Sequence, residues 1–346
     1  MTNPTHIPIS KATTLTRANL KGLPAVRAIV LSWRRLTGGG APTLVACSGG
    51  ADSNALALAL WSAGAPITIG HVVHDLRPAT EARADRDVAR ALAERLGVPF
   101  VESSIHVKGL GNDEGEARAG RYAALTEMAE GAGCSFIASA HHADDQLESM
   151  LMAIARGAGL EGLSGVAATR PLDGGLTLVR PMLSIIRSEA EAICEAGGAG
   201  WAHDLTNDDT DRFRSAVRDG PARLLLELRP GASLGAVRAG DLLRDTALLV
   251  RDRANEIFGR SDTWERGDLR SERAVVLGAG LRSASLRLTD GQGADSISRR
   301  VIDPVVRAIR DDSTEPRHFQ WPNRITVSVT ARLVTLTRTD GDPEDD

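Results

Sequence analysis

The sequence predicts an α/β fold, in which a Rossmann-like domain with a parallel sheet precedes a small helical region with terminal strands. Between about residues 43 and 205, short apolar runs alternate with segments of helical period. Strands separated by single helices form βαβ units, whose parallel strands pair in one sheet covered on both faces. After Pro221 the alternation stops and helical periods dominate. These two observations divide the chain into a sheet domain and a helical region.

The individual elements follow from the apolar residues. Residues 1–38 form an extension that ends in an amphipathic helix, since apolar side chains recur there at helical spacing. Strands are predicted at 43–47, 67–73, 98–101 and 136–139, and helices at 55–60, 81–96, 115–130 and 144–156. Further on, helices are predicted at 224–228, 241–258 and 299–310, and a hairpin at 324–338. The domains are therefore expected at 39–220 (sheet), 225–315 (helices) and 316–340 (terminal strands), with a disordered acidic tail at 341–346.

Composition excludes several classes of protein. The 346 residues carry a net charge of −4, and no apolar run approaches the roughly 20 residues needed to cross a bilayer. We expect no membrane span and a cytoplasmic location, although the acid-free start before Asp52 also resembles a transit peptide. None of the three lysines stands in a Gly-Lys-Ser/Thr string, which excludes a Walker-type phosphate loop. Cys47, Cys134 and Cys194 are too far apart for a zinc ribbon or a disulfide scaffold.

A glycine loop carries the strongest chemical signal. The string Ser48-Gly49-Gly50-Ala51-Asp52-Ser53 directly follows the first predicted strand and opens a helix. Backbone amides in such a loop converge on an anion, and the helix N-terminus adds a positive dipole end. Asp52 would repel a bare phosphate, which argues for a bridging Mg²⁺ ion with Asp52 as its ligand. The alternative is an ordinary glycine turn before a helix.

Two further strings place basic residues near the predicted sheet edge. His71, His74 and Arg77 cluster at the end of the second strand, where they suit contacts to ribose, adenine or phosphate; the alternative is a solvent-facing pair of histidines. Arg118 lies on a later helix beside Tyr122, the single tyrosine of the chain. An ion pair with an acid four residues earlier explains Arg118 equally well.

Acidic residues cluster at the start of another predicted helix. Asp144, Asp145 and Glu148 lie within one turn, and His141 and His142 directly precede them. Like charges so close predict a bound cation, either Mg²⁺ or an ammonium group. The alternatives are an acidic first turn that favours the helix dipole, or a His/Asp/Glu metal site.

Together these strings resemble a known family. Residues 48–53 are similar to the pyrophosphate-loop (PP-loop) signature of the N-type ATP pyrophosphatases, which are adenine nucleotide alpha hydrolase-like enzymes. Strings at 71–77, 114–122, 140–146, 156–163, 180–181 and 201–207 narrow the resemblance to the tRNA(Ile)-lysidine synthetases. They occur in family order and spacing over roughly residues 40–220, with departures from the family pattern at Val73, Asp75 and Ser215.

The resemblance implies an ATP- and Mg²⁺-dependent ligase. Such an enzyme attaches free lysine to C2 of the wobble cytidine of tRNA(Ile) with a CAU anticodon. The reaction passes through an adenylated tRNA and yields lysidine, AMP and pyrophosphate. The resemblance further implies catalytic roles for Asp52, Arg118 and His141, and recognition of lysine by Asp145 and Glu148. ATP would be bound by the remaining predicted residues together with Asp52, namely Ser48, Gly49, Gly50, Ala51, Ser53, His74 and Arg77.

Other readings of the sequence stay open. A PP-loop tRNA thiolase has the same loop, but its usual cysteine pair and cluster-binding Cys-x-x-Cys are missing. A module that senses ATP without catalysis and a small-molecule adenylating synthetase are two further alternatives. For an RNA substrate, the helix at 299–310 supplies a candidate phosphate-contacting face with Arg299, Arg300, Arg307 and Arg310, and an ordinary solvated helix is its alternative. The oligomeric state is left open, a homodimer included.

Overall fold

The computed structural model describes residues 15–74, 79–106, 113–201, 212–292 and 296–339. The chain divides into two compact units, Met1–Leu243 (unit 1) and Arg244–Asp346 (unit 2). The division falls inside helix α11 (Ala232–Phe258), which begins earlier than the predicted helix at 241–258. The predicted domain boundaries, which rest on the change of apolar periodicity after Pro221, remain predictions. Among the described residues, no helix combines the length and apolar character that a membrane span requires.

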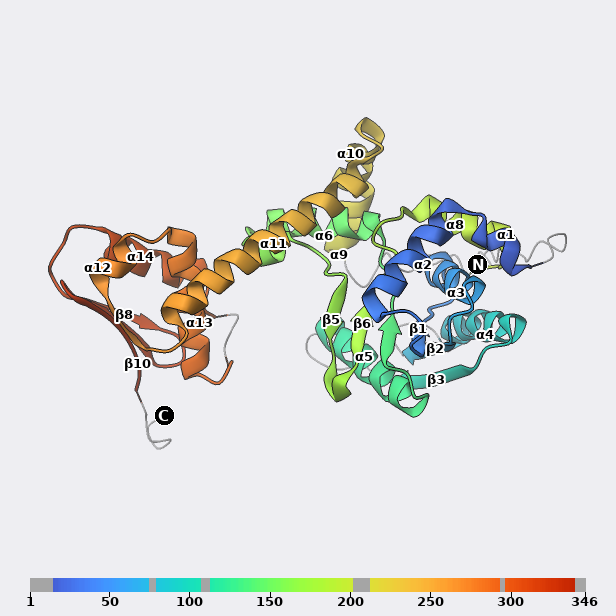
Figure 1. Cartoon of the computed structure of the whole chain (residues 1–346), viewed down its shortest axis with the longest axis horizontal. Helices are drawn as coiled ribbons and strands as arrows, with labels where there is room; N and C mark the ends of the chain where they lie inside the picture. Colours follow the sequence, from blue (N-terminus) through green and yellow to red (C-terminus); the bar gives the residue numbers. More distant parts are fainter. Residues whose placement is uncertain (1–14, 75–78, 107–112, 202–211, 293–295, 340–346) are drawn as a thin grey trace. The chain divides into compact units, whose positions relative to one another are not determined.

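A six-stranded, mostly parallel sheet forms the centre of unit 1 (Figure 1). Its order is β3-β2-β1-β4-β6-β5, and every neighbouring pair is parallel except β5 with β6. The strands are β1 (Thr43–Ala46), β2 (Ile67–His74), β3 (Phe100–Ile105), β4 (Phe136–Ala138), β5 (Thr169–Pro171) and β6 (Thr177–Val179). The predicted parallel sheet is confirmed. The inner strand β6 and the edge strand β5 are additions that the sequence pattern did not indicate.

Helices cover both faces of this sheet, because side chains alternate along each strand. Val45 of β1 packs with α2, α3 and α8, whereas its neighbour Leu44 packs on the opposite face with α5. The helices of unit 1 are α1 (Arg17–Lys21), α2 (Pro24–Thr37), α3 (Ala51–Ser62), α4 (Ala79–Leu96), α5 (Asp113–Gly131), α6 (Ala143–Ala155), α7 (Leu160–Leu163), α8 (Arg187–Ala196), α9 (Arg212–Val217) and α10 (Arg223–Leu228). The short turn η1 (Asp173–Gly175) links β5 to β6, and the short helical segment η2 (Arg218–Ala222) links α9 to α10.

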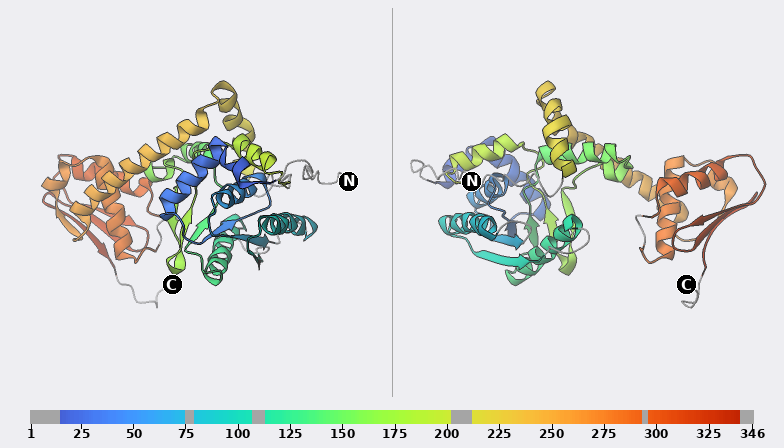
Figure 2. Two further views of the ribbon diagram at one scale, coloured as in Figure 1. Left: turned by 45° about the vertical axis from the view of Figure 1, so that its right-hand side comes forward. Right: turned by 180° about the vertical axis from the view of Figure 1, so that it is seen from behind.

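Unit 2 has its own core around a four-stranded antiparallel sheet, in the order β7-β10-β9-β8. Its elements are β7 (Thr263–Glu265), α12 (Arg266–Arg270), α13 (Ala274–Leu288), α14 (Arg299–Arg310), β8 (Arg317–Trp321), β9 (Ile325–Val329) and β10 (Leu333–Arg338). The helices pack on one face of the sheet (Figure 2), and β9 alternates buried and half-buried residues accordingly. The predicted hairpin is confirmed as β9 and β10.

Candidate active site

The glycine loop connects β1 to α3 and has one conformation that only glycine tolerates well. Gly49 has a φ of +90°, and a Cβ atom at this position would lie 2.7 Å from the backbone oxygen of Asp85. Both facts exclude a side chain there. Gly50 is the N-cap of α3 and has extended backbone angles. The loop therefore turns the chain sharply and directs the first turn of α3 toward the carboxyl edge of the sheet.

Hydrogen bonds within the loop hold its amides in place. The Ser53 hydroxyl accepts from the backbone N–H of Ser48 at 3.2 Å and donates to the carbonyl of Gly50 at 3.0 Å. The Ser48 hydroxyl lies 3.3 Å from the Ser53 hydroxyl. Within the described residues, the amides of Ala51 and Asp52 have no backbone acceptor, as expected for the first turn of a helix. The loop thus presents preorganised donors to an anion.

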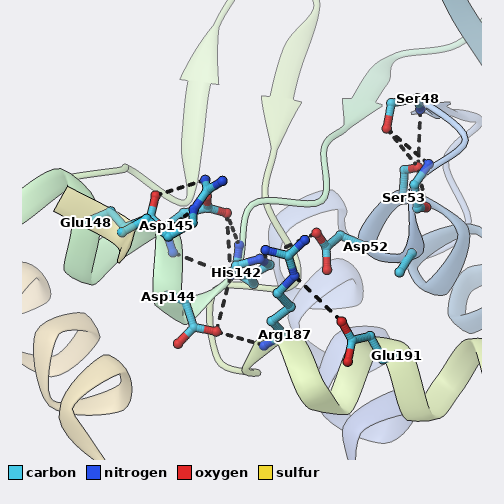
Figure 3. A network of polar contacts seen from close by, with 12 residues as sticks. Ser48, Asp52, Ser53, His142, Asp144, Asp145, Glu148, Arg187 and Glu191 are labelled. Carbon is cyan, nitrogen blue, oxygen red and sulfur yellow. Dashed lines mark hydrogen bonds and ion pairs between the residues drawn. The ribbon is translucent and has the colours of Figure 1, made fainter. Parts of the chain in front are cut away.

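Asp52 projects from this first turn toward the centre of the site (Figure 3). Its Oδ2 atom lies 3.5 Å from Nε2 of His142, while its Oδ1 atom is buried and has no hydrogen-bond partner. A buried carboxylate oxygen without a partner is costly and fits a bound cation. The described residues contain no cluster of three His, Cys, Asp or Glu side chains suited to a metal ion. With one buried carboxylate oxygen left without a partner, Asp52 fits Mg²⁺, which is commonly held by one carboxylate together with substrate phosphates.

His142 connects Asp52 to the acidic end of α6. It is the N-cap of this helix, and its backbone N–H donates to Oδ2 of Asp145 at 2.9 Å. Its Nδ1 atom lies 3.5 Å from Asp145 and 3.7 Å from Asp144. Asp144 also accepts from the backbone N–H of Arg187 at 2.8 Å and from the hydroxyl of Ser233. Asp144 thereby links the start of α6 to the starts of α8 and α11, beside the imidazole of His142.

The surrounding carboxylates decide the charge of His142. Burial lowers its pKa, but Asp145, Asp52 and Asp144 outweigh burial and raise the pKa to about 9. The backbone N–H of Asp145 also points at Nδ1, which would require an unprotonated nitrogen, yet this contact is long at 3.4 Å. Two carboxylates beside the same nitrogen outweigh one weak amide contact. His142 is therefore an imidazolium at neutral pH.

This charge predicts how the stability of unit 1 depends on pH. Because the pKa of His142 is raised above the usual 6.5, its stabilising contribution is complete below pH 6.5 and is lost as the pH rises through about 9. The shift corresponds to about 3 kcal/mol. We expect wild type to be more stable than His142→Asn at pH 6 by about this amount, and the difference to vanish by pH 10. Asparagine is a good N-cap, so the comparison isolates the charge.

Urea unfolding of both proteins without Mg²⁺, repeated across this pH range, measures the difference. A constant difference from pH 6 to pH 10 would show that His142 does not carry the charge assigned to it.

Two arginines already pair with the acidic residues of α6. Glu148, whose side chain is only 5% exposed, accepts from Nε of Arg218 at 2.7 Å and from Nε of Arg214 at 3.0 Å. Nη2 of Arg214 also donates to Oδ1 of Asp145 at 2.9 Å. Burial would raise the pKa of Asp145, but His142 and Arg214 outweigh it and lower the pKa to about 2. The predicted cation near Asp145 and Glu148 is thus supplied, in this structure, by the protein itself.

An open pocket of about 360 Å³ lies beside these pairs. It is lined by Arg118, His141, Ser149, Met152, Arg156, Val166, Phe213 and Arg214. The His141 ring is held by the Ser139 hydroxyl, 3.0 Å from Nδ1. Burial lowers the pKa of His141 to about 4. The charge of Asp145 raises this pKa and the nearby arginines lower it, so the ring is neutral at pH 7. Guanidinium groups, apolar side chains and one neutral imidazole suit a ligand with a flat ring and negative charge.

Comparison with known proteins agrees with this geometry. Residues 37–223 match the family model of the PP-loop domain. The tRNA(Ile)-lysidine synthase of Bordetella bronchiseptica is 34% identical over 268 residues, which cover 75% of this chain and 76% of that protein. The chain belongs to the tRNA(Ile)-lysidine synthase family. The resemblance of the sequence strings to this family is therefore confirmed.

Other members of the family are longer than this chain. The tRNA(Ile)-lysidine synthase of Geobacter sulfurreducens is 36% identical over 225 residues, covering 63% of this chain and 47% of that protein. For the one from Thermus thermophilus the identity is 37% over 202 residues, with coverage of 57% and 38%. The chain thus spans about half the length of these relatives, or less. A U34-tRNA thiolase of Methanococcus maripaludis shares the fold, with a TM-score of 0.54 and 20% identity over 66% of this chain and 81% of that one.

The structure brings most of the predicted residues together at one edge of the sheet. The loop residues Ser48 to Ser53, His141, Asp145 and Glu148 follow β1 or β4, which are neighbours, and Arg118 reaches the same pocket from α5. Their individual roles in the lysidine synthase reaction remain predictions. Arg77 and the side chain of His74 lie outside the described residues. His71 is buried, and its Nδ1 lies 2.8 Å from the carbonyl of Cys47, so it supports the loop from behind.

Several residues of the site carry no recognisable signal in the sequence. Asn54 ties the loop to the end of the sheet domain, because its side-chain amide donates to the carbonyl of Gly200 at 3.0 Å. Phe213 and Met152 contribute the apolar lining of the pocket.

Arg214 and Arg218, by contrast, do have a signal in the sequence. Their Arg-x-x-x-Arg spacing places both side chains on one face of a helix, which could have indicated a shared acidic partner.

Proposed function

We propose that the chain forms lysidine in tRNA, joining free lysine to C2 of a wobble cytidine at the expense of ATP. The contact between Asp52 and His142 carries this proposal, because it joins the phosphate loop to the acidic start of α6 beside the His141 pocket. One catalytic centre can then hold a nucleoside triphosphate, a flat base and an amine together. The names of the relatives support the choice of this reaction within the family.

In the first step the loop positions ATP. The amides of the first turn of α3 and the hydroxyl of Ser48 bind the phosphates, the Ser53 hydroxyl exchanges its bond to Gly50 for a phosphate oxygen, and Asp52 would hold Mg²⁺. When bound, Mg²⁺ neutralises charge on the triphosphate and on the departing pyrophosphate. The oxygen on C2 of cytosine attacks the α-phosphorus, the bond to the bridging oxygen breaks, and pyrophosphate leaves. Arg118 faces the pocket and stabilises the charge that develops.

In the second step the neutral ε-amine of lysine attacks C2, and the proton that its nitrogen loses passes to water at the open pocket. The C2–O bond breaks and AMP leaves, which is feasible because the oxygen is now esterified. Neutral His141 accepts a hydrogen bond from the amine and orients it, but a pKa of about 4 makes it too weak a base to keep the proton. Asp145 and Glu148 attract an ammonium group of lysine in competition with Arg214 and Arg218, which already pair with them. These arginines therefore shift when lysine binds.

The cysteines argue against thiolase chemistry at this site. Cys47 and Cys194 are buried, and burial raises the pKa of each thiol. Both are therefore protonated at neutral pH, whereas sulfur transfer requires a thiolate.

The proposed enzyme acts in the cytoplasm on tRNA(Ile) with a CAU anticodon, and unit 2 contributes to holding that tRNA.

Labelled lysine tests the function directly. Purified protein is incubated with ATP, Mg²⁺, labelled lysine and a tRNA(Ile) transcript with a CAU anticodon. We expect label in the RNA, dependent on ATP and absent from a matched transcript with a UAU anticodon. Pyrophosphate release that needs no RNA, without any labelled RNA, would instead identify a small-molecule adenylating synthetase.

A further inference from the structure

Three arginine side chains gather around Tyr122, next to the pocket but apart from the phosphate loop. Cζ of Arg170 lies 4.1 Å from the centroid of the Tyr122 ring, and Cζ of Arg118 lies 5.3 Å from it. Arg180 completes this arginine cluster: burial lowers its pKa, Tyr122 opposes the effect, and the charges of Arg118 and Arg170 lower it further. Arginine keeps its proton nonetheless. Three positive charges therefore share one small region.

These charges lack an acidic partner in the part of the chain that the structure describes. Arg180 is only 4% exposed; its Nη1 donates to the carbonyl of Ala167 at 2.6 Å, and its Nε has no partner. Nε of Arg170 is likewise buried without a partner. None of the three guanidinium groups forms an ion pair with a described carboxylate. Arg180 is buried, Arg170 is half-buried and Arg118 is exposed. Uncompensated positive charge at the first two positions is expensive, so the cluster suits an anion.

The position of the cluster in the sheet separates it from the phosphate loop. Arg180 directly follows β6, and Arg170 lies on β5, opposite Leu178 of β6. In the strand order, β4 with His141 at its end lies between β1 and β6. At about 4.8 Å between strands, the cluster lies roughly 10–14 Å from the strand that carries the phosphate loop. Along the edge of the sheet, the end of β4 with His141 thus lies between the phosphate loop and the strands that carry Arg170 and Arg180.

We propose that Arg170 and Arg180 bind a backbone phosphate of the RNA, adjacent to the nucleotide that occupies the pocket, while Arg118 of the same cluster faces the pocket itself. The inference rests on the proposed function, since it requires an RNA substrate. A guanidinium group stacked on a tyrosine uses its face, which leaves its N–H edge free for phosphate oxygens. Such a contact carries no sequence information but sets the register of the RNA. The cytosine would then reach His141 while its phosphate is held at the opposite end.

Binding measurements with Arg170→Gln test the proposal, because Arg170 is partly exposed and its loss removes charge without opening the core. Affinity for the CAU tRNA(Ile) transcript is measured at several salt concentrations, and affinity for ATP with Mg²⁺ is measured in parallel. We expect the Kd for tRNA to rise about tenfold, the salt slope to fall by about one, and the Kd for ATP to stay unchanged. Arg170→Lys keeps the charge and should retain the slope. Arg35→Gln, an exposed arginine on α2, should match wild type.

The outcomes separate this inference from the proposed function. Unchanged tRNA affinity and slope in Arg170→Gln would overturn the inference even if wild type forms lysidine. Weaker ATP binding with unchanged tRNA binding would also overturn it and assign the cluster to a phosphate of ATP. If wild type binds the tRNA with the expected dependence on Arg170 but transfers no lysine, the phosphate site stands and the proposed reaction fails. If wild type binds no tRNA, both fail.

Discussion

Replacing Asp52 with asparagine is expected to lower lysine transfer to tRNA about a thousandfold, which corresponds to about 4 kcal/mol. Asparagine has nearly the same size but no charge, so the buried Oδ1 position loses its attraction for Mg²⁺. The same change removes one of the carboxylates that raise the pKa of His142. The pKa of His142, followed by NMR, should therefore fall from about 9 toward 6.5. This second readout does not depend on enzymatic activity.

Asp87→Asn is the matched control, because Asp87 lies on α4 of the same unit with a side chain that is 62% exposed. It should leave lysine transfer and the titration of His142 unchanged. If Asp52→Asn keeps more than a tenth of the wild-type rate, Asp52 is not the metal ligand. If the rate falls but the pKa of His142 stays near 9, the Asp52–His142 contact does not exist in solution.

Local patterns predicted much of the fold. The predicted helix at 299–310 coincides with α14, because Ile302, Val305 and Ile309 recur at helical spacing and are all buried. The phosphate loop was evident because glycine, serine and aspartate follow a strand directly. β5 and β6 are three residues long, like β4, but β5 contains an arginine and a proline and β6 begins with a threonine, so neither is an apolar run like that of β4. They become strands because β4 offers an open edge, which is a tertiary effect.

The charged residues of the site were also only partly predictable from the sequence. The sequence predicted a cation near Asp145 and Glu148, since like charges on one turn require compensation. It could not predict that the compensation comes from Arg214 and Arg218, which lie 66 to 70 residues away in the chain. The arginine cluster could not be predicted from the sequence either, because Tyr122 and Arg170 meet only when β5 joins the sheet. A charge pattern indicates that a partner exists, whereas the fold decides which one.

Glu148→Gln is expected to destabilise the protein by about 2–3 kcal/mol. Breaking a fully buried ion pair costs roughly 3–5 kcal/mol, and the cost is lower here because Arg214 and Arg218 are 28% and 30% exposed and regain water. Glu191→Gln is the control: Glu191 pairs with Arg187 at 3.7 Å and is 43% exposed, so its loss should cost less than about 1 kcal/mol. Urea unfolding of the three proteins at pH 7 measures the difference.

Kinetics of the same variant distinguish two roles for Glu148. If lysine binds to this carboxylate, Glu148→Gln should raise the KM for lysine about tenfold or more and leave the KM for ATP within twofold, because one charged hydrogen bond to the amine is lost. If Glu148 only anchors Arg214 and Arg218, stability should fall while both KM values change equally or not at all. The second pattern would leave Asp145 alone to recognise lysine, because Asp145 keeps its contact with Arg214 and its place beside His142 when Glu148 loses its charge.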